Sequence, residues 1–295
     1  MLAIAPLRRV SLALFAWNLG MLAFVPTVAA FTQSESEEGA GLEWFQPCVT
    51  YSIDFRGSVD LSMETVQLIV EDSFRAWTEV TCDGVSVGIT AEESSDNATC
   101  QKAEFNSSDG NVNTIAFIDN WSELGYDPAA FALTTVFHNR RSGEILDVDL
   151  QVNENLGPYA ICPAPGGCSQ ESDSVDLQNV MTHEVGHFFG LGHSNVISAS
   201  MYFASRRGEI GKRFLRADDI AGLCFIYRDG FSNECNFSPR GGLDLDCEEE
   251  TEGGSGGGGG CSCSVADDSP WSYAFLPIAV LTLLLRRRRS IRGIR

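Results

Sequence analysis

The sequence predicts an α/β layer fold, in which a sheet packs against helices. Residues 49–55 alternate apolar and polar side chains, which is typical of a half-buried strand. Between positions 66 and 80, apolar residues recur at three- and four-residue spacing, as they do along one face of a helix. Several short apolar runs and two further helical segments follow. This order of strand, helix, several strands and two helices is typical of a layered fold.

The first helix should begin after Asp60 or Ser62, because either side chain can accept a hydrogen bond from the first helical turn. Gly57 ends the strand that precedes it. The spacing of apolar residues predicts a helix of about five turns. Its inward face consists of Val66, Val70, Phe74, Trp77 and Val80.

The next part of the chain predicts further strands joined by polar loops. The strands are expected at 85–91, 114–118, 129–137 and 144–152. The last two flank a turn segment with a glycine at position 143, a spacing that favours an antiparallel hairpin. Residues 92–113 and 155–173 are rich in polar residues, glycine or proline, and we expect them to be loops.

Two more helices are expected after these strands. The second should begin near Asp173 or Ser174 and end at about Gly190. Its core face consists of Leu177, Met181, Val185 and Phe188. The third should begin near Ala217, with two acidic residues in its first turn, where they interact favourably with the helix dipole. Its core face consists of Ile220, Leu223 and either Ile226 or Tyr227.

The chain is strongly acidic, and its charge is unevenly distributed. Lys and Arg number 20 and Asp and Glu number 40, which gives a formal net charge of −20. This balance argues against a nucleic-acid-binding protein, because phosphate recognition needs a basic surface. A hydrophobic content of 44% argues against a disordered chain. The ends differ from the rest, because residues 1–30 and 286–295 contain arginines and no acidic residue.

Both ends resemble targeting segments. Residues 1–30 combine two arginines, an apolar run and small residues at 28–30, as a cleaved secretory signal peptide does, and a membrane anchor that stays in place is the alternative. Near the other end, a glycine run ending at Gly260 precedes two cysteines, a short apolar stretch and four arginines, an order that resembles the MYXO-CTERM sorting signal. This resemblance implies tail removal near Cys261 and Cys263 and attachment at the cell surface, and a simple membrane tail is the alternative. We expect an exported protein, extracellular or anchored at the cell surface or outer membrane.

Ten cysteines fit an oxidising compartment outside the cytoplasm. Eight of them precede the glycine run, and eight cysteines allow 105 pairings, among which the sequence cannot choose. Proximity along the chain suggests the pairs Cys162–Cys168, Cys235–Cys247 and Cys82–Cys100, with Cys48–Cys224 left over. Zinc binding by cysteine is disfavoured, since the chain has no CxxC pair.

The segment from His183 to His193 carries the chemistry. His183 and His187 are four residues apart on the second helix, so both imidazoles project from one face. Gly190 lies where the helix must stop and the chain must turn back, and this turn lets His193 supply a third nitrogen ligand. Three protein ligands leave a fourth position for water, which is typical of a catalytic zinc site. Glu184, beside the first ligand, can take a proton from that water as a general base.

This HExxHxxGxxH pattern is the metzincin signature. Further residues narrow the resemblance to the matrixins, the matrix-metalloprotease-like branch. Ser194 follows the third histidine, and Met201–Tyr202 lies eight residues beyond that histidine, which is the matrixin spacing for the Met-turn. Residues 214–223 resemble the family's entry into its last helix. The resemblance covers about residues 44–230.

The resemblance implies an α+β zincin fold, with a mixed five-stranded twisted sheet, three helices, a zinc-binding active-site helix and a Met-turn. It implies one catalytic Zn²⁺, bound by His183, His187 and His193. The other implied site residues are Glu184 as general base, Met201 and Tyr202 at the Met-turn and pocket, and Asp218 and Asp219 as supports at the start of the last helix. The strand at 129–137 would bind substrate as an added antiparallel strand.

The sequence also departs from the family pattern. Only His138 lies outside the motif, so we expect the family's structural zinc to be absent. Phe203 follows the Met-Tyr pair where the family usually has proline, so the pocket wall should differ. Residues 31–43 contain no cysteine, and we therefore expect no latency through a propeptide thiol.

Two groups of charged residues suggest further binding properties. A basic cluster follows the Met-turn in the segment that shapes the matrixin specificity pocket, and it consists of Arg206, Arg207, Lys212 and Arg213. It predicts a preference for acidic or polar residues near the cleaved bond, and a solvated loop is the alternative. The candidate Ca²⁺ ligands are Asp96, Asp109, Asp147, Asp149 and Asp173, although no EF-hand spacing occurs.

Together these observations predict a secreted or surface-anchored zinc metalloendopeptidase with one catalytic domain. The expected segments are a signal peptide (1–30), a short N-terminal segment (31–43), the catalytic domain (44–230), an acidic, glycine-rich linker with cysteines (231–263) and a sorting or membrane tail (264–295). We expect a monomer that acts on protein or peptide substrates. The alternative is a surface adhesion or structural protein on a zincin scaffold with little turnover, and the intact Glu184 argues against it.

Overall fold

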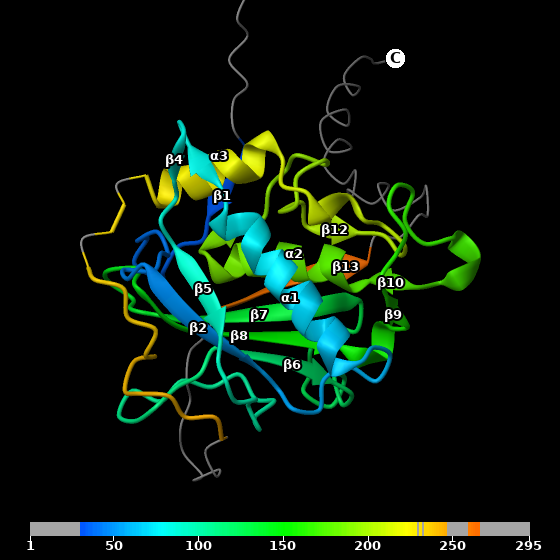
Figure 1. Cartoon of the computed structure of the whole chain (residues 1–295), viewed down its shortest axis with the longest axis horizontal. Helices are drawn as coiled ribbons and strands as arrows, with labels where there is room; N and C mark the ends of the chain where they lie inside the picture. Colours follow the sequence, from blue (N-terminus) through cyan, green and yellow to red (C-terminus); the bar gives the residue numbers. More distant parts are fainter. Residues whose placement is uncertain (1–29, 229, 232, 247–258, 266–295) are drawn as a thin grey trace, which may run out of the picture.

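A computed structural model describes residues 30–228, 230–231, 233–246 and 259–265. Its main sheet contains the expected mixed five-stranded core, in the order β7-β8-β6-β2-β5, and continues beyond β7 through β13 and β12 (Figure 1). The core strands are β2 (Cys48–Ile53), β5 (Thr90–Glu93), β6 (Thr114–Ile118), β7 (Ala130–His138) and β8 (Ile145–Asn153). The two added strands are β12 (Ala204–Ser205) and β13 (Gly259–Val265).

The strand directions make the sheet mixed. β7 and β8 are antiparallel, and they form the hairpin that the sequence predicts, with Gly143 at a φ of 74° in its turn. β8, β6, β2 and β5 are mutually parallel neighbours. β7 is therefore the edge of the five-stranded core, and its outer side is the one that β13 pairs with.

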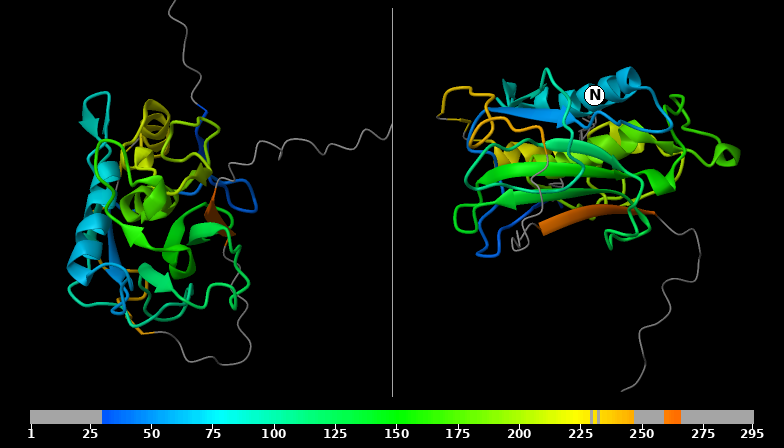
Figure 2. Two further views of the ribbon diagram at one scale, coloured as in Figure 1. Left: turned by 90° about the vertical axis from the view of Figure 1, so that its right-hand side faces the viewer. Right: turned by 90° about the horizontal axis from the view of Figure 1, so that it is seen from below.

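The structure contains the three expected helices, which share one hydrophobic core with the sheet. They are α1 (Met63–Thr78), α2 (Leu177–Phe188) and α3 (Ala217–Ile226), with short 3-10 turns η1 (Glu154–Leu156), η2 (Gln170–Ser172) and η3 (Gly211–Arg213). The side chain of Ser62 caps α1 by accepting a bond from Thr65 N at 3.3 Å. α1 and α2 contribute to one hydrophobic core with the sheet (Figure 2). Trp77 of α1 joins the two helices, because its indole nitrogen donates to the carbonyl of Thr182 at 2.8 Å.

Some expected boundaries are wrong. Residues 85–91 do not form one strand: β4 (Val85–Ser86) pairs with β3 (Thr81–Cys82) in a separate hairpin, and β5 starts only at Thr90. Gly88, at a φ of 80°, breaks the extended chain between them. α2 begins at Leu177, later than expected, because β10 (Val175–Asp176) pairs with β9 (Tyr159–Ala160) within the predicted loop region. Asp176 then caps the helix through the backbone N of Asn179 at 2.8 Å.

The N-terminal segment packs against the domain. β1 (Thr32–Gln33) pairs antiparallel with β11 (Leu191–Gly192), which follows α2. The backbone N of Ala30 donates to Asp218 Oδ1 at 2.6 Å, so this segment also contacts the start of α3. Leu42 lies in the main core. Residues 30–43 thus contribute to the structure around the motif helix.

The disulfides differ from most of the pairs that proximity suggested. Cys162–Cys168 forms as expected. The other described bridges are Cys48–Cys235 and Cys82–Cys224, so the suggested pairs Cys48–Cys224, Cys82–Cys100 and Cys235–Cys247 are wrong. These bridges join residues 187 and 142 positions apart, a separation that only the tertiary fold determines. Disulfides of this kind are typical of proteins outside the cytoplasm.

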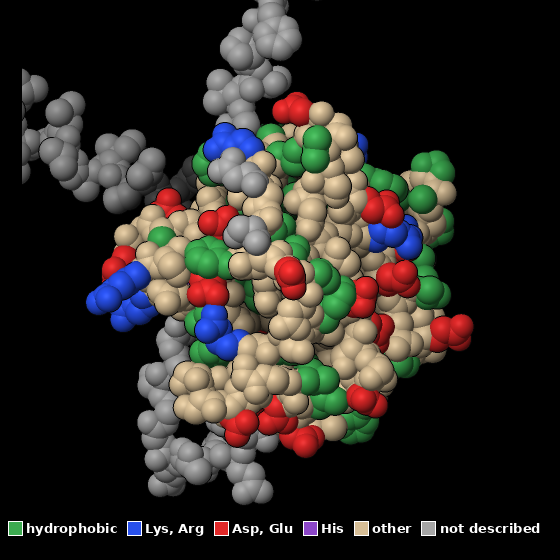
Figure 3. Space-filling view, turned by 60° about the vertical axis from the view of Figure 1, so that its left-hand side comes forward, with side chains coloured by type: hydrophobic (Ala, Val, Ile, Leu, Met, Phe, Trp, Pro, Cys, Tyr) green, Lys and Arg blue, Asp and Glu red, His purple; other side chains and the backbone are tan. Residues whose placement is uncertain are grey.

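Charged side chains are distributed over the face of the molecule shown in Figure 3. On the face shown in Figure 3, acidic side chains are scattered among uncharged ones, and the basic side chains stand apart from one another. Within the described part of the chain, every helix is too short or too polar to cross a bilayer. Residues 1–29 of the expected signal peptide and residues 266–295 of the expected tail lie outside the described residues.

Candidate zinc-binding active site

The sequence motif places three histidines around one point. His183 and His187 project from successive turns of α2. Gly190 ends the turn after the helix with a φ of 88°, and a Cβ there would lie 2.2 Å from the carbonyl oxygen of Leu42. Only glycine combines this left-handed backbone with such a close approach. The chain then returns, and His193 Nε2 lies 3.3 Å from His183 Nε2 and 3.2 Å from His187 Nε2.

Backbone carbonyls determine which ring nitrogens face inward. His183 Nδ1 lies 2.6 Å from the carbonyl oxygen of Ser200, and His187 Nδ1 lies 2.7 Å from that of Leu191. A carbonyl can only accept a hydrogen bond, so both Nδ1 atoms carry the proton and both Nε2 atoms keep a lone pair. This arrangement is how metal-binding histidines are usually oriented.

The three imidazoles are held in their neutral form. Burial lowers the pKa of His187 to about 3 and that of His193 to about 4, and the positive charge of Lys212 acts in the same direction on both. Burial followed by the Lys212 charge also lowers the pKa of His183 well below its usual value. Converging lone pairs on neutral imidazoles suit a cation such as Zn²⁺. Among the described residues, this triad is the only group of three potential metal ligands.

Glu184 lies beside the triad with one carboxylate oxygen held and the other without a partner. The hydroxyl of Thr134 on β7 donates to Glu184 Oε2 at 2.7 Å, while Oε1 is buried and has no hydrogen-bond partner. Burial raises the pKa of Glu184 to about 8, although the Thr134 bond and the charge of Lys212 oppose that rise. An orphaned buried carboxylate oxygen is costly unless a ligand or water uses it. Glu184, with Oε2 held by Thr134 and Oε1 without a partner, is therefore suited to accept a proton on Oε1.

The Met-turn packs beneath the motif helix. Met201 is 1% exposed, and a Cβ on Gly186 of α2 would lie 2.1 Å from its sulfur, so glycine is required for this contact. Asp219 accepts bonds from the backbone N atoms of Ser200 at 2.9 Å and Met201 at 3.0 Å. These bonds fix the turn that presents the Ser200 carbonyl to His183.

The remaining expected residues occupy distinct positions. Asp218 Oδ2 accepts from the hydroxyl of Ser194 at 2.6 Å, next to the third histidine, and not from the Met-turn itself. Tyr202 is partly buried, and its carbonyl accepts a bond from the ammonium of Lys212. Phe203 is 45% exposed, and its ring centroid lies 6.5 Å from that of His193. Phe203 thus forms an open apolar wall next to the triad.

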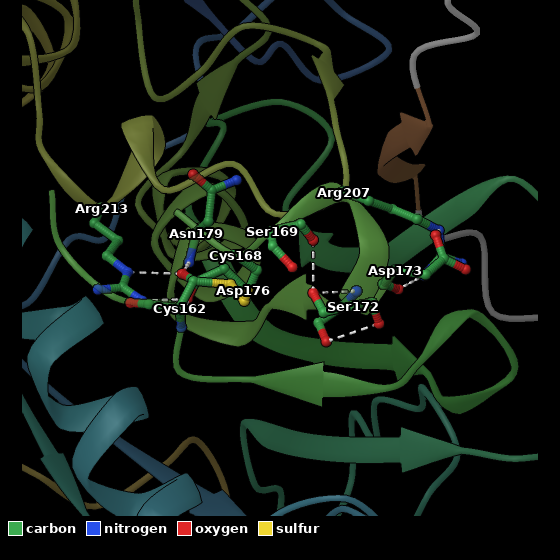
Figure 4. Close-up of a disulfide and its surroundings, with 10 residues drawn as sticks. Cys162, Cys168, Ser169, Ser172, Asp173, Asp176, Asn179, Arg207 and Arg213 are labelled. Atoms are coloured by element: carbon green, nitrogen blue, oxygen red, sulfur yellow. Dashed lines mark hydrogen bonds and ion pairs between the residues drawn. A yellow bond between two sulfur atoms is a disulfide. The ribbon is translucent and has the colours of Figure 1, made fainter. Parts of the chain in front are cut away.

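The four basic residues after the Met-turn do not share one environment. Lys212 is 2% exposed and its Nζ lies 3.3 Å from His183 Nδ1, whereas Nε2 of that ring faces His193. Arg213 pairs with Asp176 and donates to the carbonyl of Cys162 at 2.9 Å (Figure 4). Arg207 binds Asp173, and Arg206 is exposed. Only the two arginines at 206 and 207 therefore remain on the surface loop.

Two contributors to this site carry no signal in the sequence. Thr134 is one of several threonines in a strand, and only the packing of β7 against α2 brings its hydroxyl to Glu184. Lys212 was expected in the basic cluster near the specificity pocket, and the sequence did not indicate its actual position: η3 packs against α2 and buries it beside His183. Both depend on tertiary contacts.

Comparisons with known proteins agree with this geometry. Residues 43–228 match the protein family described as Matrixin. The chain is 28% identical over 205 residues to Metalloendoproteinase 1-MMP of Arabidopsis thaliana, a match that covers 69% of this chain and 48% of that protein. Shorter matches are 47% identical over 53 residues to Metalloendoproteinase 5-MMP of Arabidopsis thaliana (18% of this chain, 14% of that protein) and 45% identical over 58 residues to Matrilysin of Rattus norvegicus (19% and 21%). The chain thus spans less than half the length of each of these relatives.

Proposed function

Because the chain belongs to the matrixin family, we propose that it is a zinc-dependent metalloendopeptidase that hydrolyses peptide bonds in protein or peptide substrates. One observation carries the proposal: the Nε2 atoms of His183 and His187 lie within 3.3 Å of His193 Nε2, beside a glutamate with an unpartnered oxygen. Bound by these imidazoles, zinc would supply a Lewis acid that polarises the scissile carbonyl and lowers the pKa of water to about 7.

The chain's own groups would carry the protons and hold the substrate. Thr134 fixes Glu184 Oε2, which leaves Oε1 to take the proton of the attacking water and then pass it to the leaving amine. The outer edge of β7 lies beside Glu184 and is paired with β13 in this structure. When that edge is open, its backbone N–H and C=O groups could pair with an extended peptide substrate. Incubation of the chain with an unfolded protein tests the proposal: we expect fragments with new internal N-termini, and none in the presence of a chelator.

No observation favours the alternative of a non-catalytic surface adhesion protein, since Glu184 and all three histidines are present. The disulfides support export of the protein. We further propose that residues 1–30 are cleaved during export and that residues 264–295 direct anchoring. Ca²⁺ binding and a monomeric state stay predictions from the sequence. Of the candidate Ca²⁺ ligands, Asp147 and Asp149 lie together on β8, where burial raises the pKa of Asp149 to about 8.

Of the four basic residues expected to favour acidic substrates, only Arg206 and Arg207 remain candidates, because Lys212 and Arg213 bind other groups of the protein. Reversing both charges (Arg206→Glu with Arg207→Glu) should weaken any preference for acidic residues near the cleaved bond by up to about fivefold, the scale of an exposed ion pair. A peptide library read by mass spectrometry measures this change. The matched control reverses Arg140 and Arg141, an exposed pair in the β7–β8 turn. An unchanged cleavage profile in the 206/207 variant would remove the proposal.

A further inference from the structure

A segment from the C-terminal part of the chain lies along the edge of β7. β13 pairs antiparallel with β7 from Gly259, opposite Val136, to Ser264, opposite Ala130. It also pairs in parallel with β12, through Ser264 opposite Ala204. In the right-hand view of Figure 2, β13 (orange) runs along the outer edge of the sheet. β13 is therefore an extended strand paired with β7 on one side and with β12 on the other.

This position coincides with the catalytic groups. Cys261 stands opposite Thr134, the residue whose hydroxyl binds Glu184. β13 also contacts α2, and β12 follows directly after the Met-turn. In this structure Glu184 is 0% exposed and His187 is 1% exposed. A carboxylate that must meet water and a substrate carbonyl is thus enclosed in this state of the chain.

We propose that Gly259–Val265 occupies the substrate-binding edge of its own catalytic domain and restrains peptide hydrolysis until it is displaced or removed. This inference rests on the proposed peptidase function. A substrate that adds a strand to β7 needs the same backbone groups that β13 uses, so the two exclude each other. Backbone pairing places few demands on side chains, which explains how a segment as small and glycine-rich as GGCSCSV can occupy the edge.

Because β13 is covalently linked to the catalytic domain, even weak pairing with β7 can keep the edge occupied. Between Asp246 and Gly259 lie twelve residues, five of which are glycine. A short, glycine-rich linker gives an effective concentration on the order of 1 mM. A strand that binds with a dissociation constant of about 0.1 mM would then occupy the edge in about nine of ten molecules. External substrate would meet an apparent KM raised about tenfold, with kcat unchanged, because the restraint is competitive.

The same segment contains Cys261 and Cys263, where the sequence suggests processing of the tail. An enzyme that cuts or modifies this pair needs the segment in an accessible form, away from β7. Processing and restraint would therefore be mutually exclusive, and release of peptidase activity would accompany attachment or tail removal.

Proline substitution in the full-length chain tests the proposal. Ser262→Pro removes a backbone N–H and imposes a φ that a strand interior does not favour. The matched control is Ser255→Pro, which places the same residue in the linker outside β13. With a quenched fluorescent peptide, we expect Ser262→Pro to lower KM about tenfold at constant kcat, and Ser255→Pro to resemble the wild type. Equal KM values for all three active proteins would overturn the proposal.

Hydrogen–deuterium exchange provides a second readout that does not depend on activity. The backbone amides of β7 that face β13 should exchange at least about tenfold faster in Ser262→Pro than in the other two proteins. Identical exchange in all three would show that β13 does not protect the edge, and would contradict the proposal. If no form hydrolysed the peptide, the peptidase function would fail, and the exchange result alone would decide the inference. A cut within 259–265 by the wild type, and not by Glu184→Gln, would make the segment a substrate and overturn its restraining role.

Discussion

Glu184→Gln should lower peptide hydrolysis by about 10²- to 10⁴-fold, the usual contribution of a general base. Glutamine can keep the bond from Thr134 at the position of Oε2, so the local packing of the variant should be preserved. An amide cannot take a proton from water at the position of Oε1, which is the oxygen without a partner. The loss should therefore appear in kcat, with little change in KM.

Measuring the zinc content of Glu184→Gln distinguishes loss of the general base from disruption of the metal site. Glu184 is not one of the three clustered histidines, so the variant should bind as much zinc as the wild type. Glu64→Gln, which changes an exposed glutamate in the first turn of α1, is the matched control and should hydrolyse peptide normally. Retention of full activity by Glu184→Gln would exclude the mechanism.

His193→Ala should weaken zinc binding by more than about 100-fold, because it removes one of the three proposed ligands, whereas loss of an outer-shell partner already costs 10- to 100-fold. His193 is the proposed ligand that comes from outside α2, and its Nε2 lies within 3.3 Å of both other Nε2 atoms. The two helical histidines keep their carbonyl partners at Ser200 and Leu191, so the fold should survive the change. Peptide hydrolysis should fall with the zinc content.

The fourth histidine of the chain is the natural control for this experiment. His138 lies at the end of β7, where Nδ1 contacts the carbonyl of Val136 at 3.0 Å and Nε2 contacts Glu37 at 3.3 Å. His138→Ala should retain zinc and activity. Competition with a chromophoric chelator measures both affinities, and similar zinc loss from the two variants would contradict the assignment of the ligands.

Local patterns predicted the parts of this protein that local physics determines. The spacing of Val66, Val70, Phe74 and Trp77 placed α1, and all four are buried. The β7–β8 hairpin and α3 also formed close to their expected bounds. The motif histidines came together because a helix and a glycine turn fix their relative positions within eleven residues.

Long-range contacts account for what the sequence could not predict. The start of α2 shifted to Leu177 because β10 pairs with β9, a contact between segments with weak strand patterns. Two of the three described disulfides join distant residues, so proximity along the chain was a poor guide. Ile220 was expected in the core, yet it is 36% exposed, since the inward side of α3 is formed by Leu223 and Ile226. Thr134 and Lys212 reached the site through packing against α2.

Zinc titration of the metal-free, full-length Ser262→Pro chain tests the central claim most directly, because this form should have an open substrate edge. Cleavage of an unfolded protein should be absent without metal, rise in proportion to added zinc, and level off at one zinc per chain. The products should carry new internal N-termini. Cleavage that does not depend on metal, or a zinc-loaded chain that produces no fragments, would contradict the assignment of this protein as a zinc metalloendopeptidase.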